Sequence, residues 1–144
     1  MSAAGGRALG LDLGSKRIGV AVADRTGTIA SPLRVLHRSG SVRRDHLAIA
    51  ELVIEEEADI VVVGLPLNMN GSSGPAARAA IDEAAALATV VSVPVVTFDE
   101  RRTTVTADQA MIEANMRAQA RRRIVDKIAA AVMLQNWLDA GGPR

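Results

Sequence analysis

Three acidic positions in this sequence lie where apolar segments end or begin, and together they have the composition of a metal site. Asp12 lies inside an apolar segment that starts at Arg7, and an unpaired buried charge is costly. Asp99 and Glu100 close a second apolar segment, and Asp126 lies just inside the last one. Because no basic residue follows Arg7 within the first segment, a metal ion is one candidate for neutralising Asp12.

Asp12, Glu100 and Asp126 at one point would form a hard oxygen-ligand site, which suits Mg²⁺ or Mn²⁺. Zinc fits poorly, because the sequence has no cysteine and His37 and His46 lack ligand spacing, so we assign neither histidine a role. Two such ions about 4 Å apart stabilise the attacking and leaving oxygens of an in-line phosphodiester displacement. The residue types therefore indicate a nuclease, with Asp99 as a possible supplement to the three acids.

Each acid also has a structural alternative when it is taken alone. Asp12 would then be a hydrogen-bonded strand residue, and Glu100 an exposed loop residue. Asp126 would be one half of an ion pair. The candidate partners for that pair are Arg122, Arg123 and Lys127.

Length and charge distribution restrict the class of protein. The 144 residues are 49% hydrophobic, which predicts one globular domain over residues 7–140, with a disordered tail at 1–6 and a short tail at 141–144. The net charge is +1, but residues 101–127 hold seven basic residues against three acidic ones. Such a cluster holds a polyanion near a metal site, or else forms a solvated helix face.

Several classes of protein are disfavoured by composition. The absence of cysteine excludes thiolate catalysis and disulfides and fits a reducing compartment. No apolar run approaches about 18 residues, so we expect a cytoplasmic protein with no membrane partner. Phe98 and Trp137 are the only aromatic residues, which argues against a single-strand binder built on stacking.

Hydrophobic periodicity predicts an α/β domain in the order βββαβαβαα. The first three strands are joined by short turns, which predicts antiparallel hairpins, and the later strands are β-branched runs typical of parallel strands. In the helix at 42–57, the spacing predicts that Leu47, Ala50, Val53 and Ile54 face inward. The predicted strands are 7–13, 17–24, 28–37, 59–65 and 93–98, and the predicted helices are 42–57, 75–88, 103 or 104 to 115, and 120–140.

The same elements predict how the acids meet. The carboxyl ends of parallel strands converge on one crevice, where Asp12 would meet Glu100 if their strands are neighbours. In the last helix Asp126 shares a face with Ala130, Met133 and Trp137 at 100° per residue. The small side chain of Ala130 would let that face approach the sheet closely.

Four blocks of the sequence resemble the YqgF, or RuvX, family of RuvC-like Holliday junction resolvases, which have the RNase H-like fold. The blocks are 12–21, 63–72, 98–104 and 126–131, in the family's order. The resemblance implies a five-stranded mixed sheet, three antiparallel strands then two parallel ones, flanked by helices, with Asp12, Glu100 and Asp126 as the metal-binding acids. Arg102 departs mildly from the family pattern, which more often has an apolar or small residue there.

Basic and amide residues near these blocks are candidates for nucleic-acid contact. Lys16 and Arg17 follow Asp12 in a tight turn and would reach a bound phosphate, unless they are ordinary surface cations. Asn68 and Asn70 lie in a loop whose sequence is also typical of plain turns, the interpretation that we favour. The candidate set is Lys16, Arg17, Asn68, Asn70, Arg101, Arg102, Arg121, Arg122, Arg123 and Lys127.

The sequence therefore predicts a hydrolase, a metal-dependent endonuclease acting on structured nucleic acid. The resemblance implies either maturation of the 5′ end of precursor 16S rRNA in ribosome biogenesis, which we place first, or resolution of four-way junctions in DNA recombination and repair. Two symmetric cuts in a junction would require a homodimer. A non-catalytic binding module is a third hypothesis. An actin-like or sugar-kinase ATPase is disfavoured, because such enzymes need two such domains.

Overall fold

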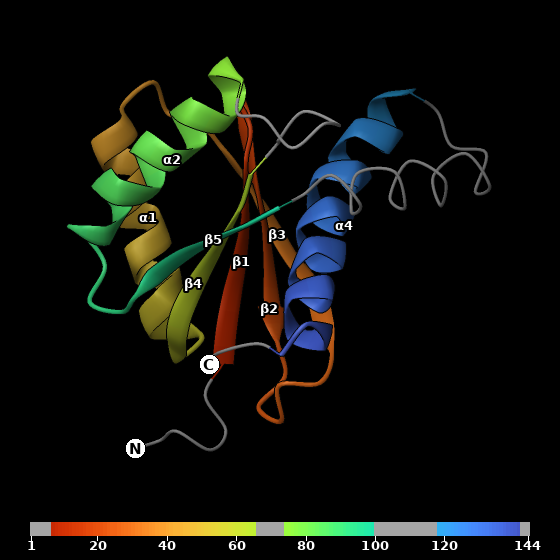
Figure 1. Cartoon of the computed structure of the whole chain (residues 1–144). Helices are drawn as coiled ribbons and strands as arrows, with labels where there is room; N and C mark the ends of the chain where they lie inside the picture. The colour runs from red at the N-terminus through yellow and green to blue at the C-terminus, as the bar shows by residue number, and fades with distance from the viewer. Residues whose placement is uncertain (1–6, 66–73, 100–117, 142–144) are drawn as a thin grey trace.

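A five-stranded mixed sheet lies between two helical layers in the computed structural model (Figure 1). The structure describes residues 7–65, 74–99 and 118–141, and the side chains of Asp99 and of residues 118–127 are outside the description. The strand order is β3-β2-β1-β4-β5. The elements are β1 (Arg7–Leu13), β2 (Arg17–Ala23), β3 (Ala30–His37), α1 (Val42–Glu55), β4 (Ala58–Leu65), α2 (Pro75–Ala88), β5 (Val95–Asp99) and α4 (Ala118–Asp139).

The strand directions confirm the predicted topology. β1 pairs with β2 and β2 with β3 in antiparallel hairpins, whereas β4 runs parallel to β1, and β5 parallel to β4. α2 joins the parallel strands β4 and β5, as is usual for a parallel connection, whereas the chain between β1 and β4 passes through β2, β3 and α1. The helix predicted between 103 or 104 and 115 lies outside the described residues. None of the described helices is long and apolar enough to cross a bilayer.

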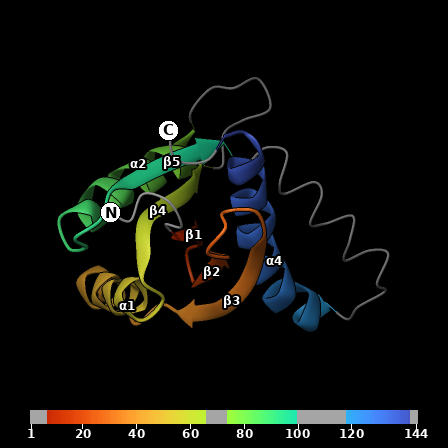
Figure 2. The same ribbon diagram turned by 90° about the horizontal axis from the view of Figure 1, so that it is seen from below.

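Each face of the sheet has its own hydrophobic core, because side chains alternate along a strand. Leu9 and Leu11 of β1 pack with Ile49 of α1 and Leu87 of α2 on one face. On the other face Ala8 packs against α4. Of the described helices, Figure 2 shows α1 and α2 together on one side of the sheet and α4 on the other.

The α4 face of β1 consists of small residues, and this allows a very close approach of the helix. A Cβ atom added to Gly10 would lie 3.0 Å from Leu134 Cβ and 3.4 Å from the carbonyl oxygen of Ala130. Ala130 is itself fully buried. The prediction that Ala130 lets the last helix approach the sheet is therefore confirmed.

One prediction about α1 is wrong. Leu47 is 47% exposed and Ile54 is 74% exposed, although both were expected to face the core. Val53 is buried as predicted, and the rest of the buried face carries Ile49 and Leu52 together with Asp45 and His46. Compared with the predicted orientation, the helix is rotated about its axis. Polar contacts of Asp45 and His46 fix its N-terminal part, and hydrophobic periodicity does not detect such contacts.

We predict that Gly10→Val lowers the free energy of unfolding by about 1–3 kcal/mol, as overpacking a close-packed interface usually does. The added methyl groups would force α4 away from β1, since one extra carbon already meets Leu134. Urea denaturation measures the change, with Gly10→Ala expected to give a smaller loss. Equal stability of the wild type and Gly10→Val would show that α4 is not held this close.

Candidate functional site

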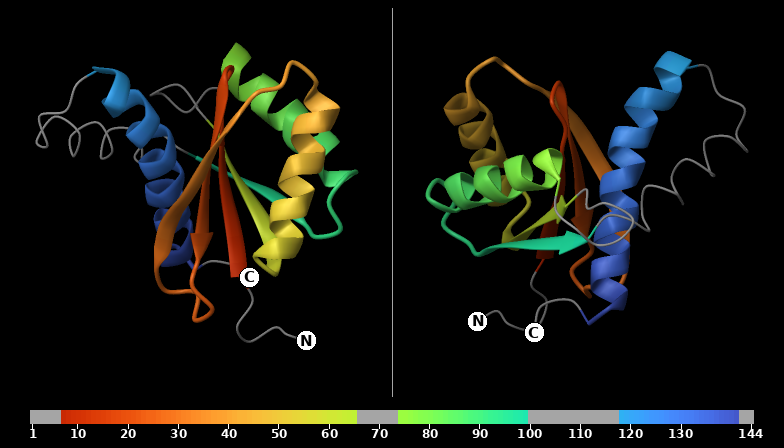
Figure 3. Two further views of the ribbon diagram at one scale, coloured as in Figure 1. Left: turned by 180° about the vertical axis from the view of Figure 1, so that it is seen from behind. Right: turned by 45° about the horizontal axis from the view of Figure 1, so that its top comes forward.

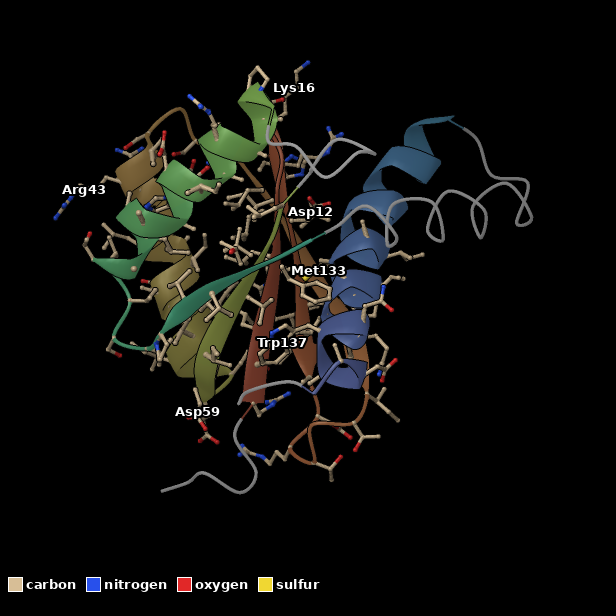
Figure 4. The ribbon with its side chains drawn as sticks, in the orientation of Figure 1. Asp12, Lys16, Arg43, Asp59, Met133 and Trp137 are labelled. Atoms are coloured by element: carbon tan, nitrogen blue, oxygen red, sulfur yellow. The ribbon has the colours of Figure 1, made fainter. Side chains whose placement is uncertain are left out.

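Asp12 lies near the carboxyl end of β1, on the face that α4 covers. It is half-buried and pairs in register with Gly19 of β2. Alternation along β1 places it on the same face as Ala8 and Gly10. Figure 4 shows Asp12 farther along the sheet than Met133 and Trp137, toward the end where Lys16 lies. The carboxylate is thus held beside an apolar helix–sheet interface.

Glu100 follows the last residue of β5, but β1 and β5 are not neighbours. β4 lies between them, so the neighbouring strands that would bring Asp12 and Glu100 directly together are not found. Leu11 of β1 pairs with Val63 of β4, and Leu65 of β4 pairs with Asp99 of β5. The carboxyl ends of the three parallel strands therefore lie together, at the end of the sheet that we call the carboxyl edge. Since adjacent strands are about 4.8 Å apart, the β1 and β5 backbones are separated by about 10 Å. Glu100 itself lies outside the described residues.

Asp126 belongs to the N-terminal half of α4, which runs antiparallel to β1 (Figure 3). Residue 126 precedes Ala130 by one turn, and Asp12 follows Gly10 by two strand positions. The step from Ala130 to residue 126 along α4 and the step from Gly10 to Asp12 along β1 each cover about 6 Å. Both run toward the carboxyl end of β1 and start where Gly10 and Ala130 are in contact. The backbone therefore places residue 126 level with Asp12, while its side chain is outside the description.

Within the described part of the chain, no group of three His, Asp or Glu side chains could hold a metal ion. Glu100 and the side chain of Asp126 are outside that part, so the three-acid site stays a prediction. Asn68, Asn70, Arg101 and Arg102 are also outside the described residues. The backbones of Arg121, Arg122, Arg123 and Lys127 lie in the N-terminal half of α4, and their side chains are not described.

The turn after Asp12 is built around Gly14. The Gly14 amide donates to the carbonyl oxygens of Asp12, at 3.1 Å, and of Arg17, at 2.9 Å. A Cβ atom at Gly14 would lie 2.6 Å from the Arg17 carbonyl oxygen, so only glycine fits. This geometry explains why a glycine follows two residues after Asp12. It leaves Lys16 exposed and Arg17 half-buried.

Arg38, just after β3, fixes this turn from outside. Its backbone amide donates to the Lys16 carbonyl oxygen at 2.9 Å, and its Nε donates to the Gly14 carbonyl oxygen at 3.0 Å. Its two terminal nitrogens donate to the carboxylate of Glu83 in α2, at 2.7 and 2.9 Å. Asp45 of α1 lies 3.7 Å from the same guanidinium. One side chain thus joins the turn to both helices of that layer.

His46 completes this network. It is 2% exposed, and its Nε2 lies 2.9 Å from Glu83 Oε2. Asp45 accepts hydrogen bonds from the amide and the hydroxyl of Ser39, at 3.0 and 2.8 Å. We gave His46 no role from the sequence, and the structure gives it a packing role. The available signal was a polar pair, Asp45 and His46, at the start of an amphipathic helix.

The network also sets the protonation of its two carboxylates. Burial alone would raise the pKa of Glu83, but hydrogen bonds from Arg38 and His46 and their charges lower that pKa overall. The pKa of Asp45 is likewise lowered, because the hydrogen bonds from Ser39 and the charge of Arg38 outweigh its burial. Both groups are therefore ionised in the folded protein at neutral pH.

Comparison with known proteins identifies the family. The sequence profile of a family described as "RuvX: Holliday junction resolvase" matches residues 6–140. The chain belongs to the RuvX family. A "Putative pre-16S rRNA nuclease" of Mycobacterium sp. (strain KMS) is 47% identical over 135 residues, covering 93% of this chain and 80% of that protein. A protein of the same name from Myxococcus xanthus (strain DK1622) is 44% identical, covering 95% of this chain and 90% of its own length.

The RuvX assignment agrees with the fold. The structure of T. thermophilus RuvC in complex with a Holliday junction substrate superposes with a TM-score of 0.59 at 16% identity, covering 94% of this chain and 96% of that one. At this identity the likeness concerns the fold alone. It confirms the predicted RuvC-like, RNase H-like architecture, and membership of the RuvX family makes the chain a member of a nuclease family.

We predict that Glu83→Gln lowers the free energy of unfolding at pH 7 by about 1–3 kcal/mol, since Arg38 loses its ionised partner. A carboxylate with a lowered folded-state pKa contributes stability above its ordinary value, 4.5 for Glu83, and loses it as the pH falls through the folded value. The wild type should therefore lose stability below about pH 5 more steeply than Glu83→Gln. Urea titrations at several pH values measure both slopes.

The exposed Glu51 of α1 provides the control, and Glu51→Gln should leave the free energy of unfolding at pH 7 nearly unchanged. Identical slopes for the wild type and Glu83→Gln would remove Glu83 from the set of groups that stabilise the fold at neutral pH.

Proposed function

We propose that this chain is a divalent-metal-dependent endonuclease that hydrolyses phosphodiester bonds in structured nucleic acid, with 5′-end maturation of precursor 16S rRNA as its reaction. The observation that carries the proposal is the position of Asp12, half-buried at the carboxyl edge of the sheet and level with residue 126 of α4. The relatives named as pre-16S rRNA nucleases, which match over more than nine-tenths of this chain, support the choice of RNA.

Asp12, Glu100 and Asp126 are the proposed ligands and catalytic acids. Carboxylate oxygens are hard donors, so the donor set fits Mg²⁺ or Mn²⁺, and the turn at Gly14 holds the backbone of Asp12 in place. When bound, such an ion lowers the pKa of a coordinated water and offsets charge on the leaving oxygen. The role of this chain is to hold the acids in place and to bind the flanking phosphates through Lys16 and its neighbours.

Resolution of four-way DNA junctions is the second candidate, and the description of the matching family favours it. Both substrates present closely spaced duplex phosphates, so the proposed acids would serve either one. The two candidates differ in assembly, because paired symmetric cuts need two active sites on one junction. A homodimer on junction DNA that makes paired nicks would therefore favour the second candidate.

We predict that Asp12→Asn reduces cleavage by orders of magnitude while nucleic-acid affinity changes only a fewfold. The amide keeps the volume of the side chain but removes the charge that a metal ligand needs. Gel assays with Mg²⁺ or Mn²⁺ on a labelled precursor rRNA fragment, a mobile four-way junction and plain duplexes measure both quantities. Millimolar Mg²⁺ should also raise the melting temperature of the wild type more than that of Asp12→Asn.

Asp59 provides a matched control, because it is an exposed strand aspartate at the opposite edge of the sheet (Figure 4). Asp59→Asn should cleave like the wild type. Wild-type cleavage by Asp12→Asn would refute the proposed site.

We also predict that cells depleted of this protein accumulate 16S precursor with an extended 5′ end. The wild-type gene should restore the mature end and the Asp12→Asn gene should not, because the acid is proposed to act in cleavage. Primer extension on total RNA measures the 5′ ends. Normal ends after depletion would transfer our preference to junction resolution.

A further inference from the structure

Four exposed cations lie around the end of the sheet where Asp12 is found. Lys16 lies in the turn between β1 and β2, Arg43 and Arg44 in the first turn of α1, and Arg78 in the first turn of α2. In the described part of the chain, none of them forms an ion pair with an acid. Figure 4 shows the side chain of Arg43 pointing away from the protein.

The placement of the three arginines opposes helix stability. The N-terminus of a helix carries partial positive charge, so a cation there is unfavourable by about 0.3–1 kcal/mol. The first turn of α2 has no acid, and that of α1 has only Asp45, which is buried against Arg38 and Ser39. Residues that break a local stability rule without a compensating contact are typical of functional surfaces.

The opposite edge of the sheet shows the contrasting pattern. There Arg7 pairs with Glu56 at 3.4 Å, and Arg25 pairs with Glu57. Asp59 also lies at this edge, away from Lys16 (Figure 4). Lys16, Arg43, Arg44 and Arg78 thus have no ion-pair partner within the described part of the chain, whereas Arg7 and Arg25 at the far edge are paired with acids.

The cations are also held in fixed relative positions. Arg38 joins the β1–β2 turn to Asp45 of α1 and Glu83 of α2, so the three elements that carry the cations are tied at one point. A shallow hollow between them is lined by residues from all three elements. These residues are Ser15, Arg38, Gly40, Val42, Asp45 and Glu83. A rigid arrangement of cations loses little entropy on binding a rigid polyanion.

We propose that Lys16, Arg43, Arg44 and Arg78 form a phosphate-binding surface for the duplex that flanks the cleaved bond. It lies at the carboxyl edge on the α1–α2 side of the sheet, whereas Arg121–Arg123 belong to α4 on the other side, so nucleic acid crossing Asp12 is held from both sides. The occupant is a duplex backbone, because spaced single cations without aromatic residues match phosphates and not bases. This inference rests on the proposed function for the identity of its ligand.

The test measures binding without cleavage. Fluorescence anisotropy without divalent metal, on a labelled precursor rRNA fragment containing a duplex, gives the dissociation constant at several salt concentrations. Arg43→Ala/Arg44→Ala should reduce the salt slope by roughly 1 per arginine and weaken binding about 10-fold at low salt. Arg43→Lys/Arg44→Lys should keep the wild-type slope. The melting temperature of the alanine variant should not fall, since cations at a helix N-terminus do not stabilise it.

Arg25 supplies charge-matched controls at the opposite edge. Arg25→Glu changes the net charge by as much as Arg43→Ala/Arg44→Ala. Arg25→Ala changes the net charge by as much as Arg78→Ala. Both Arg25 variants should bind with nearly the wild-type dependence on salt. The proposed phosphate-binding surface would be refuted if Arg43→Ala/Arg44→Ala kept the wild-type salt slope, or if Arg25→Glu lost as much of the slope as that variant.

Single-turnover cleavage with Mg²⁺ separates the two proposals. With saturating enzyme, Arg25→Ala should cleave at the wild-type rate, whereas Arg43→Ala/Arg44→Ala should need a higher enzyme concentration to reach saturation. If the wild type binds but never cleaves, and the slopes still differ as expected, the surface stands and the nuclease proposal fails. If the wild type cleaves and Arg43→Ala/Arg44→Ala binds with the wild-type salt slope, the proposed surface fails and the nuclease proposal stands.

Discussion

The contacts of the Arg38 guanidinium are the interaction on which the arrangement of the α1–α2 layer depends. A partly buried cation is costly unless it is paired, and Arg38 finds a carbonyl oxygen in the turn after Asp12 and carboxylates in both helices. Each partner comes from a different element, so all three must dock before the charge is satisfied. The guanidinium holds the Gly14 carbonyl and the backbone amide of Arg38 holds the Lys16 carbonyl, and together they fix the turn that follows the proposed metal ligand.

A second constraint acts on the other face, where α4 approaches β1 at Gly10. Apolar contact between Gly10, Ala130 and Leu134 leaves no room for a larger side chain at the contact point. This close approach brings the N-terminal half of α4 to the level of Asp12. A helix that packed on larger side chains would stand farther from the sheet, and residue 126 would then be too far away to share an ion with Asp12. Small residues in β1 therefore serve the proposed site as well as the core.

The two faces divide the work that a nuclease must perform. The α4 face carries Asp12, the one proposed acid whose side chain is described, half-buried beside an apolar helix–sheet interface where water screens a charge less. The α1–α2 face presents exposed cations on a rigid layer. Lys16, Arg43, Arg44 and Arg78 lie toward the Asp12 end without an ion-pair partner in the described part of the chain, whereas Arg7 and Arg25 at the far edge are paired with acids. A polyanion approaching this RuvX family member is drawn toward the edge where the proposed chemistry takes place.

The sequence by itself determined the elements, the strand directions and the family, because these follow from local periodicity, turn residues and motif blocks along the chain. It also identified Asp12 as unusual, since a charge in an apolar strand is conspicuous without coordinates. It misjudged the buried face of α1, because Leu47 and Ile54 were expected to be buried and are exposed in the structure. It also left His46 without a role, and it left open whether the strands of Asp12 and Glu100 are neighbours. Those features were decided by tertiary structure, because the rotation of a helix and the order of strands depend on contacts between residues far apart in the chain, such as Arg38 with Glu83 and Gly10 with Leu134.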